Sequence, residues 1–196
     1  MTTLDRVLRR LVADLDALEL RWALVGGLAV SARAEPRTTR DVDIALDVTD
    51  DLGAEQTVLA LRQRGYGDAG QMLEHEVTGR LAAMRMVTPS PDVAVVDLMF
   101  ASTGIEPEIV LAATPVDVLP GVTVRVASLA HLLAMKVLAG RMQDAADFVN
   151  LFRRASDREL DEARAALGLI TKRRTHRRKD LALEFERLCA AARRET

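Results

Sequence analysis

The chain of 196 residues is predicted to be an α/β (α+β) protein, in which a mixed sheet with helices precedes a C-terminal helical bundle. Short apolar strands alternate with amphipathic helices in the front part, whereas helical patterns dominate afterwards. Hydrophobic residues make up 49% of the sequence, enough for a core, and only 3% are aromatic, so aliphatic side chains must fill it. We expect an α/β core over residues 1–127 and a helical region with a basic tail over residues 128–196.

The front elements follow two periodicities. Apolar residues three and four positions apart predict an opening helix up to Leu18, and four apolar residues before Gly26 predict a buried strand. Alternation after Asp41 is typical of a strand, and Gly65 ends the next helical pattern. Pro89-Ser90-Pro91 separates two further strands. The predicted elements are helices near 4–18 and 51–64, and strands at 22–25, 42–46, 81–87 and 92–101.

The back elements are mostly helical. Pro120-Gly121 predicts the turn of a hairpin. Ser128 can cap a helix that stops at Gly140, and the capping box that begins at Ser156 starts a helix that we expect to end at Gly168. The predicted elements are a short helix near 105–112, strands at 115–118 and 122–126, helices over 128–140, 142–154 and 156–168, and a last helix through the basic tail.

The most informative motif joins a double glycine to two carboxylates. The strand at 22–25 runs into Gly26-Gly27, a tight turn that brings backbone N–H groups close to a ligand, and Ser31 follows one helical turn later. After thirteen intervening residues, Asp41 and Asp43 alternate with aliphatic residues, so both carboxylates fall on one strand face. Their repulsion of about 3 kcal/mol at roughly 6 Å favours a bridging divalent cation. Oxygen ligands indicate Mg²⁺ or Mn²⁺.

Each half of this motif also has a plainer interpretation. A double glycine can simply form a turn, and a D-x-D can lie on a solvated rim. The order of strand, Gly-Gly turn, helix and D-x-D strand nevertheless suits a unit that holds a triphosphate and its metal. The chain has no G-x-x-x-x-G-K-[ST], which excludes a P-loop, and no G-x-G-x-x-G after a strand.

The combined motif resembles the core of the DNA polymerase β-like nucleotidyltransferase superfamily, whose usual form is G-[GS], a spacer and D-x-[DE]. The resemblance implies a nucleotidyltransferase-fold mixed sheet and a third carboxylate from a neighbouring strand. Asp97 lies in the apolar run 93–100 and fits that place, because a carboxylate among aliphatic residues is costly without a metal or a reacting hydroxyl. A strand-end acid exposed to water is the alternative.

A lone lysine marks the helical half. Of 27 basic residues 24 are arginine, and Lys136 is the only lysine before position 172. The arginine bias is also compatible with a GC-rich genome, but a lysine in the apolar helix 132–138 indicates that a compact ammonium is needed there. Asp144 and Asp147 lie along the same side if the two helices continue. Plain salt bridging among these residues is the alternative.

Lys136 and the aspartates behind it, following the front motif, resemble the AbiEii/MenT-type nucleotidyltransferase toxins over about residues 20–155. The chain departs from that pattern at Gln143, where the family often has a basic residue. The resemblance implies a toxin of a toxin–antitoxin system that transfers a nucleoside monophosphate, characteristically a pyrimidine, from an NTP to the 3′ acceptor end of tRNA. Aminoacylation and translation would stop, and a cognate antitoxin would restrain the enzyme.

We expect a division of roles within this site. The two D-x-D carboxylates would hold Mg²⁺ against the NTP phosphates, which the glycine turn and Ser31 would cradle. Lys136 would neutralise charge on the departing pyrophosphate, and Asp97 would align or deprotonate the attacking hydroxyl. Asp147, and with it Asp144, would either orient Lys136 or contact the nucleoside, and the sequence leaves both roles open.

Two residues just before the D-x-D strand are further candidates. Arg40 borders the metal site and could reach a phosphate, although a surface role is equally compatible. Thr39 falls on the same strand face as Asp41 and Asp43, so its phosphorylation would repel the incoming triphosphate and silence the enzyme. An antitoxin that acts as a kinase would be one agent of such control. A plain turn threonine is the alternative.

Positive charge is concentrated at the end of the chain. Residues 172–196 contain nine basic and four acidic residues, whereas residues 1–171 contain eighteen and twenty-five. Such density suits phosphate backbones, although a solvated helix face is the alternative. The predicted RNA-binding residues are Lys172, Arg173, Arg174, Arg177, Arg178 and Lys179.

Three functions are compatible with these patterns. The basic tail and the rear helices favour an RNA-directed nucleotidyltransferase toxin. A small-molecule nucleotidyltransferase, for instance one that modifies an aminoglycoside, would need an acidic acceptor pocket, and a nonenzymatic interaction protein on this fold is the third possibility. No uncharged apolar run approaches the roughly 18 residues of a membrane span, and no signal-peptide pattern is present. We therefore expect a cytoplasmic protein with no membrane partner.

Overall fold

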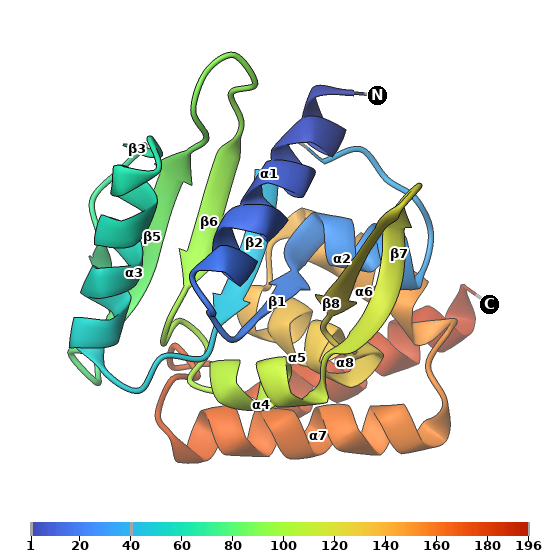
Figure 1. Ribbon diagram of the computed structural model, residues 1–196. Helices are drawn as coiled ribbons and strands as arrows, with labels where there is room; N and C mark the ends of the chain where they lie inside the picture. The colour runs from blue at the N-terminus through green and yellow to red at the C-terminus, as the bar shows by residue number, and fades with distance from the viewer. Residues whose placement is uncertain (1, 40, 196) are drawn as a thin grey trace.

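The computed structural model describes residues 2–39 and 41–195, which contain eight helices and an eight-stranded mixed sheet (Figure 1). The helices are α1 (Thr3–Ala17), α2 (Gly26–Arg33), α3 (Asp51–Gln63), α4 (Glu106–Ala112), α5 (Leu129–Ala139), α6 (Met142–Phe152), α7 (Asp157–Lys172) and α8 (Leu181–Arg194). The strands are β1 (Trp22–Val25), β2 (Asp41–Leu46), β3 (Gly67–Asp68), β4 (Leu73–Glu74), β5 (Leu81–Val87), β6 (Val95–Met99), β7 (Thr114–Leu119) and β8 (Val122–Val126). The predicted class, a mixed sheet with helices followed by a helical region, is confirmed.

The strands of the sheet run in the order β3-β5-β6-β2-β1-β8-β7, and β4 pairs with β5. Two of the pairings, β2 with β6 and β1 with β8, are parallel, and the others are antiparallel. The D-x-D strand β2 therefore lies at the centre, between the strand that leads into the double glycine and the strand that carries Asp97. Sequence-distant motifs meet because β6 crosses back to lie beside β2.

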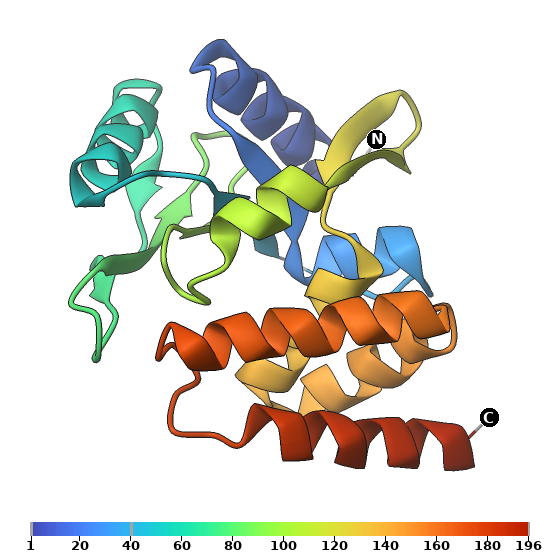
Figure 2. The same cartoon turned by 90° about the horizontal axis from the view of Figure 1, so that it is seen from below.

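The helices α5 to α8 pack against one another (Figure 2), and α5 and α6 also contact α2. Their apolar residues belong to the same continuous core as the strands, and the link between β8 and α5 is itself buried at Ala127. The backbone N–H of Ala127 donates to the carbonyl of Leu24 in β1, at 3.0 Å. The helical region is thus anchored on the centre of the sheet, and a domain boundary near residue 127 stays a prediction.

Most predicted elements of the front part are confirmed, with shifts at their ends. The strand expected over 92–101 is shorter, Val95–Met99, because residues 88–94 form a turn in which the Thr88 hydroxyl contacts the carbonyls of Asp92 and Ala94. The two-residue strands β3 and β4 were not predicted, because so short a segment shows no periodicity. The hairpin about Pro120-Gly121 is confirmed.

The end of the chain differs from the prediction in two ways. α7 passes through Gly168 and ends at Lys172, because Leu167 and Ile170 on either side are buried and their packing outweighs the low helix propensity of glycine. The expected last helix is present as α8 but begins only at Leu181, so its predicted extent through the basic cluster is wrong. Residues 173–180 form a loop, in which Arg174, Arg177 and Arg178 have positive φ angles of 62°, 51° and 58°.

Tertiary contacts explain this loop. The side chain of Thr175 is buried, and its hydroxyl donates to the carbonyl of Thr103 at 2.6 Å, which pulls the backbone out of a helical path. Lys179 donates to the carbonyls of Leu138 and Ala139, at 2.8 and 3.0 Å, and so caps the end of α5. The helix resumes at Leu181, after the N-cap Asp180.

Candidate active site

The double-glycine turn lies directly against the D-x-D strand. Gly26 has a φ of +64°, and a Cβ built on it would lie 1.9 Å from Oδ2 of Asp43, so only glycine fits there. Val25 and Asp43 are register partners in the antiparallel pair β1–β2, and the N–H of Gly27 donates to the Asp43 carboxylate. The turn therefore places the amino end of α2 on this carboxylate.

The predicted cluster of three carboxylates is brought together by the sheet. Asp41 and Asp43 share the less buried face of β2, while Val42 and Ile44 between and beyond them are fully buried. Asp43 is the register partner of Asp97 across the parallel pair β2–β6. Burial, and next the charge of Asp97, raise the pKa of Asp43 to about 6. The site therefore disfavours a full set of negative charges without a positive partner.

Asp97 has such a partner within the protein. Its two carboxylate oxygens accept from Nε and Nη2 of Arg85 on β5, each at 2.7 Å. This fork raises the pKa of the Arg85 guanidinium. Residues 2–39 and 41–195 contain no group of three acidic, histidine or cysteine side chains arranged to hold a metal ion. A metal role for Asp41, Asp43 and Asp97 therefore stays a prediction.

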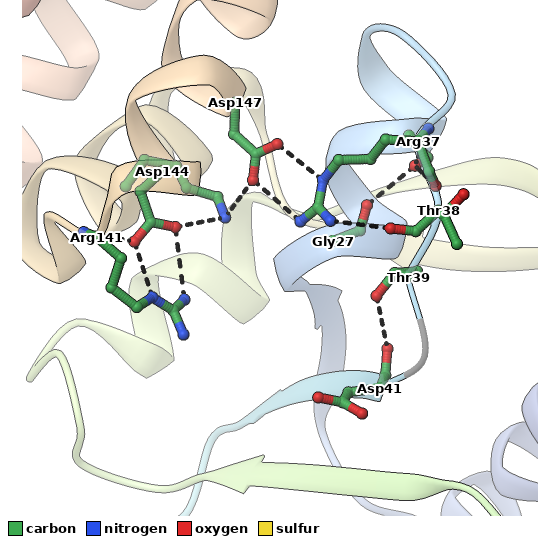
Figure 3. A network of polar contacts seen from close by, with 10 residues as sticks. Gly27, Arg37, Thr38, Thr39, Asp41, Arg141, Asp144 and Asp147 are labelled. Atoms are coloured by element: carbon green, nitrogen blue, oxygen red, sulfur yellow. Dashed lines mark hydrogen bonds and ion pairs between the residues drawn. The ribbon is translucent and has the colours of Figure 1, made fainter.

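Lys136 on α5 takes part in a buried cluster of ion pairs with Asp144 and Asp147 on α6, whose side chains Figure 3 labels. The Lys136 side chain is 7% exposed, and its Nζ lies 3.0 Å from Oδ1 of Asp144 and 2.7 Å from Oδ2 of Asp147. Asp144 also accepts from the backbone N–H and the Nε of Arg141, at 3.0 and 2.9 Å. Burial raises the pKa of Asp144, but the hydrogen bonds from Arg141 and Lys136 outweigh it and lower that pKa below its ordinary value.

Asp144 and Asp147 both contact Lys136, and their two possible roles, orientation of Lys136 or contact with the nucleoside, stay predictions. Each carboxylate is 2% exposed in its side chain and contacts the ammonium directly. The alternative of plain salt bridging describes the same contacts. The positive charge of Lys136 also acts on the D-x-D strand, where it opposes the rise that burial causes in the pKa of Asp43.

One site residue was missed by the sequence interpretation. Arg37, in the loop between α2 and β2, directs its guanidinium at Asp147, with Nε 2.8 Å from Oδ1 and Nη2 3.0 Å from Oδ2. It lies 110 positions from its partner. The available signal was its position four residues before the D-x-D, beside Thr38, Thr39 and Arg40.

The remaining nucleotide-binding candidates lie around the same loop. Ser31 is on α2, where its hydroxyl donates to the carbonyl of Gly27 at 3.1 Å and accepts from the N–H of Arg37 at 3.2 Å. Thr39 Oγ1 lies 2.8 Å from the place of a Cβ on Gly27 and donates to the carbonyl of Asp41 at 3.3 Å. Arg40 is outside the described residues.

The basic cluster of residues 172–179 is partly occupied by protein contacts. Arg173 forms an ion pair with Glu108 at 2.5 Å, donates to the carbonyl of Gly104 at 2.6 Å and lines a cavity of about 420 Å³ beside α4. Lys179 caps α5, as described above. Lys172, Arg174 and Arg178 are exposed. The cluster is therefore divided between fold-stabilising residues and residues that face solvent.

A glycine turn at the amino end of a helix, a central D-x-D strand and a third carboxylate on its parallel neighbour define the nucleotidyltransferase class. The chain belongs to the AbiEii family: the family model described as nucleotidyl transferase AbiEii toxin, type IV toxin–antitoxin system, matches residues 6–195. The protein is therefore a toxin-type nucleotidyltransferase of a toxin–antitoxin system. Membership implies an NTP substrate and an antitoxin partner.

Solved structures share the fold. An antigenic nucleotidyltransferase-like protein from Paracoccidioides brasiliensis is 21% identical, with a TM-score of 0.53 over 92% of this chain and 91% of that one. The lincosamide antibiotic adenylyltransferase LnuA, solved with lincomycin bound, is 15% identical, with a TM-score of 0.50 over 74% of this chain and 93% of that one. None of the curated proteins searched matches the chain significantly. Among the described residues, no helix combines the length and the apolar character needed to cross a membrane.

Proposed function

We propose that this toxin transfers a pyrimidine nucleoside monophosphate from an NTP to the 3′ acceptor end of tRNA and so blocks aminoacylation and translation. One observation carries the proposal: the double-glycine turn contacts Asp43 of the D-x-D strand and also Arg37, which shares Asp147 with Lys136. Carboxylates for a metal thus lie near cations for a triphosphate, which is the charge pattern that phosphoryl-type transfer needs.

The donor set fits a hard divalent cation, Mg²⁺ or Mn²⁺. Asp41 and Asp43 offer carboxylate oxygens on one strand face, and burial together with the charge of Asp97 raises the pKa of Asp43, so a bound cation would favour its ionised form. These two residues would hold the ion, which when bound supplies Lewis-acid activation of the phosphate that is attacked. Asp97 would join them or accept the proton of the attacking hydroxyl if Arg85 moved aside, because Arg85 binds both of its oxygens.

The remaining residues would bind and orient the nucleotide. The Gly26-Gly27 turn presents backbone N–H groups at the amino end of α2, where an anion is favoured. Lys136 would neutralise the pyrophosphate as it departs, held in place by Asp144 and Asp147. Arg40 stays a proposed phosphate ligand, on the basis of its place beside the D-x-D alone.

The solvent-facing part of the basic cluster supports an RNA acceptor. Lys172, Arg174, Arg177 and Arg178 stand on or beside the loop 173–180, with exposed side chains that could follow a phosphate backbone. Arg173 and Lys179 would contribute less, because protein groups already bind them. A small-molecule acceptor is the second candidate, favoured by the acidic excess of residues 1–171.

Incubation of the purified protein with total tRNA and each of the four labelled NTPs in Mg²⁺ tests the proposal. We expect label on tRNA from CTP or UTP, lost when the 3′ end is oxidised beforehand and absent with the Asp43→Ala variant. A protein that labels no RNA but consumes NTP with a small aminated acceptor would favour the second candidate. Consumption of no NTP under any condition would favour an interaction protein.

The regulatory proposal for Thr39 rests on the same geometry. Its hydroxyl lies at the glycine turn and contacts the Asp41 carbonyl, so a phosphate there would bring nearly two negative charges to the nucleotide site. An antitoxin that acts as a kinase would be the agent. Mass spectrometry of toxin produced together with its antitoxin tests for the modification, and Thr39→Glu should be inactive. An unmodified Thr39 together with a fully active Glu variant would eliminate the proposal.

A further inference from the structure

Arg37 lies in an electrostatically unusual place. A Cβ on Gly27 would lie 2.7 Å from Nη2 and 3.1 Å from Cζ of Arg37, so the guanidinium packs against the first turn of α2 (Figure 3). The amino end of a helix carries partial positive charge and disfavours a cation. The N-cap, Val25, provides no side-chain cap for this turn. A positive side chain thus stands where an anion would be preferred.

The surrounding charges show a cationic excess. Lys136, Arg37 and Arg141 share the two carboxylates of Asp144 and Asp147, which leaves one positive charge uncompensated within this group. Lys136 and Arg37 both contact Asp147, so their cationic heads are neighbours. The two adjacent cations lie beside the double-glycine turn, whose Gly27 N–H already binds the Asp43 carboxylate, and together they can accept a compact, multiply charged anion next to the D-x-D strand.

We propose that Arg37 binds the β- and γ-phosphates of the NTP and that Asp147 positions its guanidinium for this contact; the inference rests on the proposed nucleotidyl transfer. The pyrophosphate portion is assigned because it carries most of the charge of an NTP and leaves as an anion. The planar fork of arginine suits two phosphate oxygens at once. Asp147 is a positioning residue in this assignment, and Arg37 is a substrate-binding one.

A purely structural role is the competing explanation. The ion pair with Asp147, together with the hydrogen bonds between Arg37 and Ser31, also fastens the loop 34–39 to α2 and α6. In that case Arg37 and Asp147 would affect nucleotide binding only by holding the loop 34–39 in its conformation. Loss of either partner would then have the same effect, and loss of both would add nothing.

Equilibrium titration in Mg²⁺ without RNA separates the two explanations. The NTP that binds wild type most tightly and its monophosphate are compared on wild type, Arg37→Gln, Asp147→Asn and the double variant. We expect Arg37→Gln to weaken triphosphate binding about tenfold or more and monophosphate binding by less than about threefold. A part of this loss should still appear when Arg37→Gln is added to Asp147→Asn, because Arg37 contacts the phosphates itself whereas Asp147 only positions it. Arg37→Lys should recover part of it.

Arg21→Gln is the matched control, because Arg21 also forms an ion pair with an aspartate, Asp47 at 2.7 Å, and the variant should bind both nucleotides as wild type does. Unchanged triphosphate binding by Arg37→Gln, equal losses for both nucleotides, or no further loss in the double variant would overturn the assignment while leaving nucleotidyl transfer intact. Wild type that binds none of the four NTPs would overturn both proposals.

Discussion

The two sides of the candidate active site hold aspartates in opposite electrostatic surroundings. On the sheet side, Asp43 lies beside Asp97, and burial together with that like charge raises its pKa to about 6. On the helical side, Asp144 is also buried, but Arg141 and Lys136 lower its pKa. The difference teaches that burial alone does not decide ionisation. On the sheet side burial and the neighbouring Asp97 carboxylate raise the pKa of Asp43, whereas on the helical side Arg141 and Lys136 stabilise the ionised form of Asp144.

The largest effect should come from the sheet side. Asp41→Ala or Asp43→Asn should lower transfer by about a thousandfold or more, because each removes half of the metal-binding pair. Folding should not suffer, since either change relieves repulsion among carboxylates. Gel assays of tRNA labelling and thermal unfolding of the same samples check both statements. Wild-type turnover by either variant in Mg²⁺ would defeat the metal assignment.

Removal of the lysine on the helical side should lower stability as well as activity. Lys136→Met leaves two buried carboxylates with one ionic partner fewer, so it should lower the free energy of unfolding by about 3 kcal/mol as well as abolish transfer. Lys136→Arg should keep the charge but lose about tenfold or more in activity, because a planar fork does not fit the place of a compact ammonium. Urea unfolding measures the free energy of unfolding, and initial rates of nucleotide transfer measure the activity. If Lys136→Met were as stable as wild type, the contrast between the two sides would be wrong.

The pH dependence of stability should differ in sign between the two aspartates. Because the folded-state pKa of Asp43 is raised from 3.8 to about 6, the folded state binds the proton more tightly, and this contribution to stability is lost as pH rises from about 4 to 6. Wild type should therefore lose up to about 3 kcal/mol relative to Asp43→Asn across that window. Asp144, with a lowered pKa, contributes stability that is lost as pH falls below its ordinary range.

Unfolding of wild type and Asp43→Asn in chelator, at intervals from pH 4 to pH 7.5, measures this difference. Parallel curves for the two proteins would contradict the raised pKa of Asp43. Mg²⁺ added at pH 7.5 should stabilise wild type and leave Asp43→Asn nearly unchanged, because the cation compensates the charge that the fold disfavours.

The smallest effect concerns the loop 173–180, which lies outside both sides of the site. Arg174→Gln combined with Arg178→Gln should weaken tRNA binding and lower its salt slope by about one to two, while NTP binding stays the same. Arg173→Gln should instead lower stability, because it breaks the ion pair with Glu108. Arg158→Gln, at an exposed ion pair on α7, is the control. An unchanged salt slope would assign Arg174 and Arg178 to solvation alone.

Local sequence patterns predicted some elements of the fold, whereas contacts between distant residues decided others. Short-range periodicity located β1, the double glycine and β2, since each depends on a few consecutive residues. Gly168 was misjudged as a helix end because the packing of Leu167 and Ile170 is invisible in local propensity. The loop 173–180 could not be predicted, because the contact of Thr175 with Thr103 that holds it joins residues 72 positions apart.

Residue type and the two-residue strand period are local properties, so the class of protein, the placement of both carboxylates on one strand face and the position of the lone Lys136 could be read from the sequence. Only the tertiary structure decided which charges are paired. Arg85 neutralises Asp97 across β5 and β6, and Arg37 reaches Asp147 over 110 positions. Such pairings depend on how distant elements pack, and burial then fixes their strength by removing water from around the charges.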